Sequence, residues 1–499
     1  MRQNINFRIV VFLMGFLLFF NGCFMLIAAG VSYLFKEGIV LEITFSAFSI
    51  LGIGALAILL TRKHDAKIQK REGYLIVALG WFLMTLSGLL PYWISGFIPN
   101  FSASFFETMS GYTTTGATIL ADIEALPKSL LFWRSVTHWI GGMGIIVLAI
   151  AILPFLGIGG FQLFTAEVPG LSSDKLHPRI ADTAKRLWQI YLGLTLVETL
   201  LLTAAGMSFF DAINHAMSTI STGGFSTKNS SIAFWNNNPL IQYIIVFFMF
   251  LAGTNFVLSY FAIKGKIFKA LQDDEFKWYS FFIVSFSILV AVLLYFKADF
   301  SQSEIAHPQV LGKVESFFRH GLFQVVAIIT TTGFVTADYT QWMPLLTITF
   351  FGLMFLGGSS GSTSGGVKVV RHLLMIKSGF LEFKRALHPN AILKARYNNK
   401  IVEDSISYTI LGFFILYLLS FIIGALGFGF MGVDFESAVG VAAATLGNVG
   451  PALGNFGPTD NYQALSQGGL WWASFLMLLG RLELFTVLIL FTPFFWKNN

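Results

Sequence analysis

Thr114-Thr115-Gly116-Ala117 is the first of four related turns along this 499-residue chain. The other three read Ser221-Thr222-Gly223-Gly224, Thr331-Thr332-Gly333-Phe334 and Asn448-Val449-Gly450-Pro451. The glycines in the third position of the four turns are 107, 110 and 117 residues apart. Such self-similarity indicates an internal repeat, so the chain is predicted to contain four related units.

The composition places these units in a membrane. Apolar residues make up 55% of the chain and charged residues 12%, whereas a soluble domain carries about 25% charged residues. Such a chain cannot cover a water-facing surface, which excludes a soluble globular enzyme, and it is too apolar to be disordered. The single Cys23 excludes a disulfide framework, and we expect it to be a buried, inert thiol.

Ten apolar runs come close to the ~20 residues that a helix needs to cross a bilayer. They lie near residues 8–35, 39–61, 74–98, 131–154, 187–208, 239–263, 279–297, 343–367, 406–430 and 469–496. Four shorter apolar stretches, which are too short to span, lie at 103–113, 210–220, 316–330 and 434–446. Each of these ends at one of the four turns, and a short helix followed by a polar turn is typical of a re-entrant loop.

The predicted fold is an all-α integral membrane protein with two N-terminal helices and four helix–pore loop–helix repeats around one pore. The two extra helices occupy residues 1–73. The pore repeats are predicted at 74–160, 187–265, 279–378 and 405–499.

Basic residues give the predicted orientation. With the N-terminus inside, the segments on the cytoplasmic side hold 24 of the 32 Lys and Arg residues, in agreement with the positive-inside rule. The four turns then enter from the outer side. We therefore expect a multi-pass protein of the cell (inner) membrane with a cytoplasmic N-terminus.

Four such turns around an axis would offer rings of backbone carbonyl oxygens, which can replace the hydration shell of a cation. Glycine allows the backbone angles that direct these carbonyls inward. Each short helix would also direct its partly negative C-terminal end at the axis, which favours a cation. Asp211 is predicted to be an N-cap at the outer start of one short helix, while Glu107 and Glu436 add negative charge near the outer mouth or early in two others.

The turn sequences T-T-T-G-A-T, S-T-G-G-F-S, T-T-T-G-F and G-N-V-G-P resemble the selectivity-filter loops of the Trk/Ktr/HKT potassium transporter superfamily. The two extra N-terminal helices make the chain similar to the TrkH/TrkG-type membrane subunits, over nearly its whole length. The resemblance implies a filter made of Thr114, Thr115, Gly116, Ser221, Thr222, Gly223, Thr331, Thr332, Gly333, Asn448, Val449 and Gly450. It implies K⁺ bound by the backbone carbonyls of Thr115, Gly116, Thr222, Gly223, Thr332, Gly333, Val449 and Gly450.

The fourth filter glycine could be Gly447 or Gly450, and Gly450 keeps the frame of the other turns. Some sodium-passing relatives carry serine at the first filter position, so Gly116 favours potassium. The resemblance further implies a homodimer with one pore per chain, regulated by a cytoplasmic nucleotide-binding subunit of TrkA type. The sequence has no glycine-rich dinucleotide motif after a strand, so we expect no cofactor in this chain, with K⁺ as the transported ion.

Residues 357–366 read Gly-Gly-Ser-Ser-Gly-Ser-Thr-Ser-Gly-Gly. Ten small residues cannot keep a helix stiff, since each glycine costs about 1 kcal/mol relative to alanine. In lipid such a break must line a cavity or pack as a seam between helices. The run resembles the family's intramembrane gating loop, which makes Gly357, Gly358, Gly361, Gly365 and Gly366 candidate gate residues.

Arg481 is a charged residue inside the last apolar run, and intramembrane charges are costly and usually functional. It matches the family's arginine below the filter, where its charge would oppose a cation. The alternative is a structural ion pair with Glu483 or another acid. Glu198 is a second mid-span charge, whose role stays open between a buried pair and transport. Histidines 138, 215 and 320 are predicted to make structural hydrogen bonds rather than bind metal.

Two other classes of function compete with a potassium channel. Gly358-Ser359-Ser360-Gly361 resembles the G-x-S-G motif of intramembrane serine proteases, with Ser360 as nucleophile, and residues 357–361 match the longer G-x-S-x-G with Ser359 as nucleophile. A protease leaves the fourfold repeat unexplained. A secondary carrier would be built from inverted repeats, whereas these repeats all enter from one side. Coupling of potassium to H⁺ or Na⁺ within a channel-like fold remains open.

Overall fold

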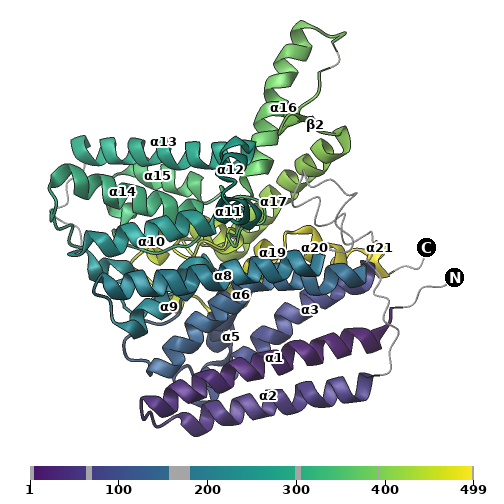
Figure 1. Cartoon of the computed structure of the whole chain (residues 1–499), viewed down its shortest axis with the longest axis vertical. Helices are drawn as coiled ribbons and strands as arrows, with labels where there is room; N and C mark the ends of the chain where they lie inside the picture. The colour runs from purple at the N-terminus through teal and green to yellow at the C-terminus, as the bar shows by residue number, and fades with distance from the viewer. Residues whose placement is uncertain (1–4, 63–69, 157–179, 298–304, 392, 497–499) are drawn as a thin grey trace.

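The computed structural model describes residues 5–62, 70–156, 180–297, 305–391 and 393–496. Within these ranges the chain is almost entirely helical, with one antiparallel hairpin of β1 (Arg396–Tyr397) and β2 (Lys400–Ile401). By length and hydropathy, six of the described helices can each cross a membrane, or up to eight spans are present if each of two bent helix pairs is one span. The chain is therefore a multi-pass membrane protein (Figure 1).

The two N-terminal helices, α1 (Phe7–Leu34) and α2 (Val40–Thr61), form a tightly packed antiparallel pair. A Cβ on Gly15 would stand 2.9 Å from the carbonyl oxygen of Gly54, and one on Gly54 would stand 2.8 Å from that of Gly15. Small residues thus let the two backbones touch, as is common between helices in lipid. Cys23 of α1 is exposed, so the expectation of a buried thiol is wrong.

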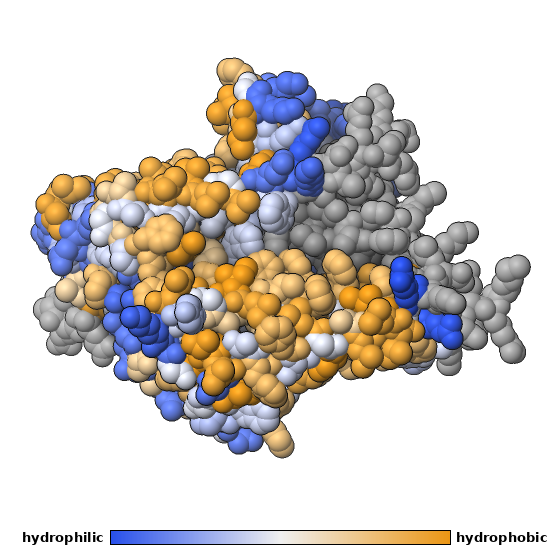
Figure 2. Space-filling model, turned by 60° about the horizontal axis from the view of Figure 1, so that its bottom comes forward, coloured by the Kyte–Doolittle hydropathy of each residue, from blue (hydrophilic) through white to orange (hydrophobic). Residues whose placement is uncertain are grey.

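The outer faces of this pair carry large apolar side chains. Leu41 is 80% exposed and Phe45 is 65% exposed, and Figure 2 shows a broad hydrophobic band across the face that contains these helices. Apolar surface of this extent costs about 25 cal/mol per Å² in water. These faces are therefore suited to contact lipid.

The remaining helices follow the order of the predicted repeats. The first group comprises α3 (Lys70–Gly88), α4 (Leu90–Ile94), α5 (Phe101–Tyr112) and α6 (Lys128–Leu156). The second comprises α8 (Ile180–Ala204), α9 (Phe209–Ile220), η2 (Ser231–Trp235), α10 (Pro239–Ala252) and α11 (Phe256–Ile263). After α12 (Ile267–Gln272), the third comprises α13 (Asp274–Lys297), α14 (Lys313–Ile329), η3 (Tyr339–Gln341), α15 (Pro344–Leu353) and α16 (Val369–Leu387). The fourth comprises α17 (Asp404–Phe430), α18 (Phe435–Leu446), η4 (Gly454–Phe456), η5 (Tyr462–Ala464), α19 (Gln467–Arg481), α20 (Phe485–Leu488), η6 (Ile489–Phe491) and α21 (Pro493–Trp496).

The short helices α5, α9, α14 and α18 lie where the sequence predicted them, and three of them start at a polar cap. The caps are Asn100, Ser208 and Asp434, each accepting a hydrogen bond of 3.1 Å from the backbone N–H three residues further on. The N–H of Ser437 stabilises the charged form of Asp434 and holds the pKa of that carboxyl below its usual value. Asp211 was predicted to cap α9 but lies in its first turn, where its carboxylate accepts from the Ser208 hydroxyl at 2.7 Å.

Two spans that were predicted to be continuous are broken. The helix predicted over 239–263 bends by 109° between α10 and α11, where Asn255 caps the new helix by accepting from the N–H of Val257 at 2.8 Å. The helix predicted over 469–496 bends by 112° after α19, because Glu483 and Leu484 have positive φ angles of 53° and 35°. The break predicted at 357–366 is confirmed, since α15 ends at residue 353 and α16 begins at residue 369.

Candidate ion pathway

The four turns share one backbone conformation after their short helices. A residue with left-handed φ of 52° to 55° follows each helix cap, and a glycine with φ of 72° to 97° comes two positions later. The left-handed residues are Thr114, Thr222, Thr331 and Asn448. The glycines are Gly116, Gly224, Gly333 and Gly450. This conformation is rare outside glycine, so its fourfold occurrence marks equivalent positions.

The shared conformation moves the register of the second turn by one residue. Gly224, rather than the predicted Gly223, is the equivalent of Gly116, and Thr222 corresponds to Thr114. The carbonyls in the second turn that correspond to those of Thr115 and Gly116 are therefore those of Gly223 and Gly224, and Ser221 is the helix cap. The sequence missed this because Gly223 and Gly224 are adjacent, and either fits a polar-x-Gly pattern.

The fourth turn follows the register that the sequence favoured. Gly447 is the C-cap of α18 and has the φ of an ordinary helical residue, −78°. Gly450 has the left-handed φ of 97°. Gly450 is thus the structural equivalent of Gly116.

The turns touch one another in a closed order. A Cβ added to the glycine of each turn would clash with a backbone carbonyl oxygen of the next turn. The pairs are Gly116 with Gly223, Gly224 with Thr332, Gly333 with Val449, and Gly450 with Thr115. The fourth turn thereby returns to the first, and the four carbonyls that precede the positive-φ glycines gather where the turns meet. Only glycine fits at these contacts, because any side chain would push a carbonyl aside.

Buried polar side chains hold the turns in place. Asn448 donates a 3.0 Å hydrogen bond from Nδ2 to the hydroxyl of Thr115, which links the fourth turn to the first. The hydroxyls of Thr113 and Thr115 are 2.8 Å apart, and those of Thr330 and Thr332 are also 2.8 Å apart. These hydrogen bonds restrain the backbone of the first, third and fourth turns, although the buried hydroxyl of Thr114 has no hydrogen-bond partner among the described residues.

The glycine-rich segment, residues 357–366, lies against three of the four turns. The N–H of Gly365 donates to the hydroxyl of Thr331 at 2.6 Å. The hydroxyls of Thr222 and Thr363 are 3.4 Å apart. A Cβ on Gly365 would stand 2.7 Å from the Cβ of Asn448. The segment therefore sits directly beside the left-handed residues of the second, third and fourth turns.

Arg481 fastens the glycine-rich segment to α6. Its guanidinium donates to the carbonyl of Thr363 at 2.8 Å and to the carbonyl of Gly141 at 3.0 Å. The side chain is 4% exposed. The predicted alternative of an ion pair between Arg481 and Glu483 is wrong, since Glu483 pairs with Arg371. Among the described residues Arg481 has no carboxylate in an ion pair, and its charge instead faces the two carbonyl dipoles and the ring of Trp81, whose centroid lies 6.0 Å from the guanidinium carbon.

Comparison with known proteins decides the family. Residues 41–498 match the TrkH family, which is described as a cation transport protein. The chain belongs to the TrkH family. It is therefore a transporter and not an enzyme, and the protease interpretation of residues 358–361 is wrong. The hydroxyl of Ser360 instead donates to Glu275 at 3.2 Å.

Several full-length relatives support this assignment. The Trk system potassium uptake protein TrkH of Escherichia coli strain K12 is 39% identical over 497 residues, which cover 99% of this chain and 100% of the relative. TrkG of the same strain is 36% identical over 497 residues, covering 98% of this chain and 99% of the relative. The crystal structure of the potassium transporter TrkH from Vibrio parahaemolyticus matches with a TM-score of 0.88 and 37% identity, covering 99% of this chain and 100% of that one.

Of the eight histidines in this TrkH-family chain, the three considered in the sequence analysis make hydrogen bonds, as predicted. His215 contacts the carbonyl of Asp211 at 2.7 Å and the hydroxyl of Ser226 at 2.9 Å. His138 contacts Ser218 at 3.4 Å, and His320 contacts Thr336 at 3.1 Å. The described part of the chain contains no group of three or more His, Cys, Asp or Glu residues that could bind a metal ion.

The two acids predicted near the outer mouth differ in their placement. Glu436 lies in the first turn of α18. Glu107 lies in the second half of α5, where it forms a fully buried ion pair of 2.8 Å with Arg134 and accepts from the N–H of Ile119 at 3.0 Å. Glu107 thus holds the chain that leaves the first turn and is not exposed at a mouth.

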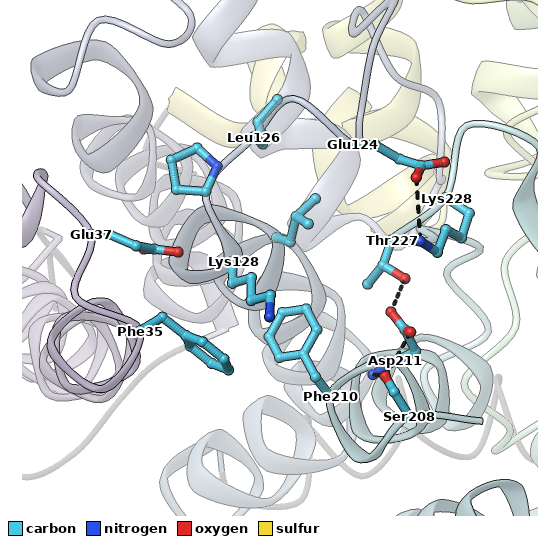
Figure 3. Close-up of a pocket in the computed structure, with 12 residues that line it drawn as sticks. Phe35, Glu37, Glu124, Leu126, Lys128, Ser208, Phe210, Asp211, Thr227 and Lys228 are labelled. Atoms are coloured by element: carbon cyan, nitrogen blue, oxygen red, sulfur yellow. Dashed lines mark hydrogen bonds and ion pairs between the residues drawn. The ribbon is translucent and has the colours of Figure 1, made fainter. Parts of the chain in front are cut away.

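A surface pocket near the second turn is lined by side chains that pair with one another. Figure 3 shows Glu124 directed at Lys228, and Asp211 directed at Thr227 and Ser208. The ion pair measures 3.2 Å and the Asp211–Thr227 hydrogen bond 2.6 Å. Because Thr227 follows the second turn, these contacts tie the exit of that turn to the start of α9.

Tyr462 supports the fourth turn, and the sequence did not reveal this role. Its hydroxyl donates to the carbonyl of Gly450 at 2.6 Å, and its N–H donates to the carbonyl of Thr118 at 2.8 Å. The ring is 2% exposed and lies against Phe106 and Phe456. It was missed because it lies 12 residues beyond its turn, in a loop without a recognisable pattern.

Tyr462→Phe should lower cation selectivity severalfold. The variant keeps the buried ring and removes one hydrogen bond, which is worth about 1 kcal/mol, so the Gly450 carbonyl is freed to turn. The measurement is the ratio of K⁺ to Na⁺ flux in liposomes. Tyr339→Phe is the matched control, since Tyr339 is also buried but donates to Ala452 at 3.4 Å, beyond the turn. Equal selectivity in the two variants would contradict a positioning role for Tyr462.

Proposed function

We propose that this chain carries potassium into the cell through a channel-like pore, with the four turns as its selectivity filter. The observation that supports this most directly is the closed order of glycine–carbonyl contacts among the four turns. Carbonyl oxygens in such an arrangement can replace the water molecules of a cation's hydration shell, so that the ion passes the constriction without them. The names of the relatives, which are potassium uptake proteins and a potassium transporter, agree with this substrate.

The glycine-rich segment is proposed as the gate below the filter. It lies beside three turns and is fastened by Arg481, whose positive charge opposes a cation in the same cavity. A segment made of glycine, serine and threonine is held by hydrogen bonds and displaces no large side chain when it moves. Its displacement would open the path without altering the turns.

The experiment that tests this proposal measures ion flux into liposomes that contain the purified chain, under potassium or sodium gradients. Potassium flux that exceeds sodium flux supports the proposal, whereas equal flux of both ions, or none, contradicts it. Repeating the measurement with a protonophore, and with sodium absent, distinguishes a passive pore from coupling to H⁺ or Na⁺. A serine-protease inhibitor should leave the flux unchanged.

The chain is proposed to work as a homodimer in the cell (inner) membrane, with a cytoplasmic nucleotide-binding subunit of TrkA type docked on its inner basic loops. Residues 368–400 hold eight Lys and Arg residues. Much of this stretch is α16, which projects from the helical body with its hairpin (Figure 1). A projecting basic element offers a surface that a second protein can grip.

We expect the chain alone to show no response to nucleotides. Addition of ATP or NAD to liposomes that hold only this chain should leave the potassium flux unchanged, because the G-x-G-x-x-G string at residues 427–432 lies at the end of helix α17 and not between a strand and a helix. The same liposomes should respond after a nucleotide-binding partner is added. Nucleotide-dependent flux through the chain alone would overturn the need for a partner.

A further inference from the structure

Glu275, in the first turn of α13, is a buried carboxylate that nothing in the proposed filter or gate accounts for. The residue is only 3% exposed. One carboxylate oxygen, Oε1, accepts three hydrogen bonds: from the N–H of Ser360 at 2.7 Å, from the hydroxyl of Ser360 at 3.2 Å, and from the N–H of Val370 at 3.1 Å. A buried carboxylate is tolerated when hydrogen-bond donors surround it in this way.

The donors lie on both sides of the glycine-rich segment. Ser360 belongs to its first half, and Val370 belongs to the first turn of α16, which follows the segment. A single oxygen therefore joins the two ends of the stretch between residues 360 and 370. Moving the segment as a unit requires these bonds to break or Glu275 to move with it.

Glu275 also supplies what the start of α16 lacks. The first N–H groups of a helix have no partners within the helix and favour a negative charge. Lys368, the residue at the N-cap of α16, makes no capping hydrogen bond with its side chain. Glu275 takes that role from a different helix, so the position of α16 depends on α13.

The residues just before Glu275 are fastened to the hairpin outside the helical body. The side-chain amide of Asn398, at the hairpin tip, donates to Asp273 at 2.7 Å, and its side-chain oxygen accepts from the N–H of Asp274 at 2.8 Å. Lys377 of α16 forms an ion pair of 2.9 Å with Asp274. Hydrogen bonds thus join the hairpin tip to Asp273 and Asp274, and these two residues directly precede in the chain the residue that holds the segment.

We propose that Glu275 is the positioning residue that holds the glycine-rich segment beneath the filter, and that the hairpin of residues 396–401 is where a force from outside the membrane reaches it. The proposal rests on the proposed function, because it assigns a role in potassium gating. It names the protein element that a cytoplasmic partner must displace. Glu275 makes its hydrogen bonds with Ser360 and Val370 and, within the described part of the chain, with none of the filter turns, so ion selectivity should not depend on it.

Glu275→Ala should raise resting potassium flux at least severalfold while the ratio of K⁺ to Na⁺ flux stays within a factor of two. Glu275→Gln keeps an oxygen that accepts hydrogen bonds and should give a smaller rise. Glu72→Ala is the matched control: Glu72 is 1% exposed and accepts a backbone N–H from Asn6 at 2.7 Å, far along the chain from the segment. It should leave resting flux unchanged.

Hydrogen exchange of the detergent-solubilised chain gives a second measurement that does not depend on flux. Peptides that cover residues 357–370 should exchange faster in Glu275→Ala and Glu275→Gln than in the parent. Glu72→Ala should leave these peptides unchanged. If the alanine variant does not fold, the glutamine variant decides, because its shape is nearly that of the parent.

The role of the hairpin is tested by substituting two neighbouring residues of its turn. Asn398 and Asn399 both have left-handed φ, 49° and 62°, so glycine preserves the turn at either position. Asn398→Gly removes the bonds to Asp273 and Asp274 and should raise resting flux, and its effect should not add to that of Glu275→Ala. Asn399→Gly should have no effect.

Potassium flux through the parent with unchanged resting flux and exchange in both Glu275 variants would overturn this proposal and leave the proposed function intact. A parent chain that carries no potassium would overturn both. Additive effects of Asn398→Gly and Glu275→Ala would remove the hairpin from the mechanism.

Discussion

Gly116→Ser should lower the preference for potassium over sodium by about tenfold, which corresponds to about 1.4 kcal/mol of selectivity. Gly116 has φ of 80°, and its added Cβ would clash with the carbonyl oxygen of Gly223 in the next turn. Because that oxygen belongs to the backbone, it can yield only by turning away from its position among the four carbonyls. The measurement is the ratio of K⁺ to Na⁺ flux in liposomes with matched protein content.

Gly96→Ser is the control that distinguishes the displacement of a carbonyl oxygen from backbone strain alone. Gly96 has nearly the same φ, 77°, but an added Cβ there would meet nothing within 4 Å. Both substitutions therefore carry the cost of left-handed backbone, about 1–2 kcal/mol, and only Gly116→Ser displaces a carbonyl. Selectivity that falls equally in both variants, or in neither, would remove Gly116 from the filter.

The second turn offers a test of the structural register. Gly224→Ser should reduce selectivity as Gly116→Ser does, since its added Cβ would clash with the carbonyl oxygen of Thr332. An added Cβ on Gly223 would instead meet the ring of His138, a side chain outside the turns. If Gly224→Ser retained full selectivity, the equivalence of Gly224 with Gly116 would not hold at the level of function.

The sequence was sufficient to predict the elements whose signals are local. Apolar runs of helical length predicted α1, α2, α13 and α17, and the four turns could be recognised from glycine beside threonine, serine or asparagine. The ten-residue run of small residues predicted the break between α15 and α16, because helix propensity alone rules out a stiff helix there. Each of these inferences needed only neighbouring residues.

The bends and the side-chain partners could not be predicted in the same way. The break between α10 and α11 is marked only by Gly253-Thr254-Asn255, where Asn255 is a helix start within an otherwise apolar run. The break after α19 depends on Glu483, which pairs with Arg371 from a helix more than 100 residues earlier. Contacts of this kind depend on tertiary packing, which a single sequence does not display.

Arg481→Ala should raise resting potassium flux by about tenfold or more with little change in selectivity. At an effective dielectric near 20, a unit charge 4 Å away raises the energy of a cation by about 4 kcal/mol. Water in the cavity screens part of this, and about 1.4 kcal/mol of it already corresponds to tenfold in rate. The same change removes the hydrogen bonds to Thr363 and Gly141, so the glycine-rich segment also loses its tie to α6.

Arg481→Lys separates the charge from the hydrogen bonds, since lysine keeps the charge but lacks the planar fork that reaches two carbonyls at once. Low flux in the lysine variant would assign the barrier to charge, and high flux would assign it to the tie between the segment and α6.

Deletion of several residues within 357–366 should raise resting flux in either case, because the shortened segment cannot lie beside three turns. Arg385→Ala serves as the control and should leave flux unchanged, because Arg385 of α16 has a side chain that is 42% exposed and pairs with Glu382 of the same helix. If the deletion and Arg481→Ala both fold, reach the membrane and stay as closed as the parent, the gate lies in another segment.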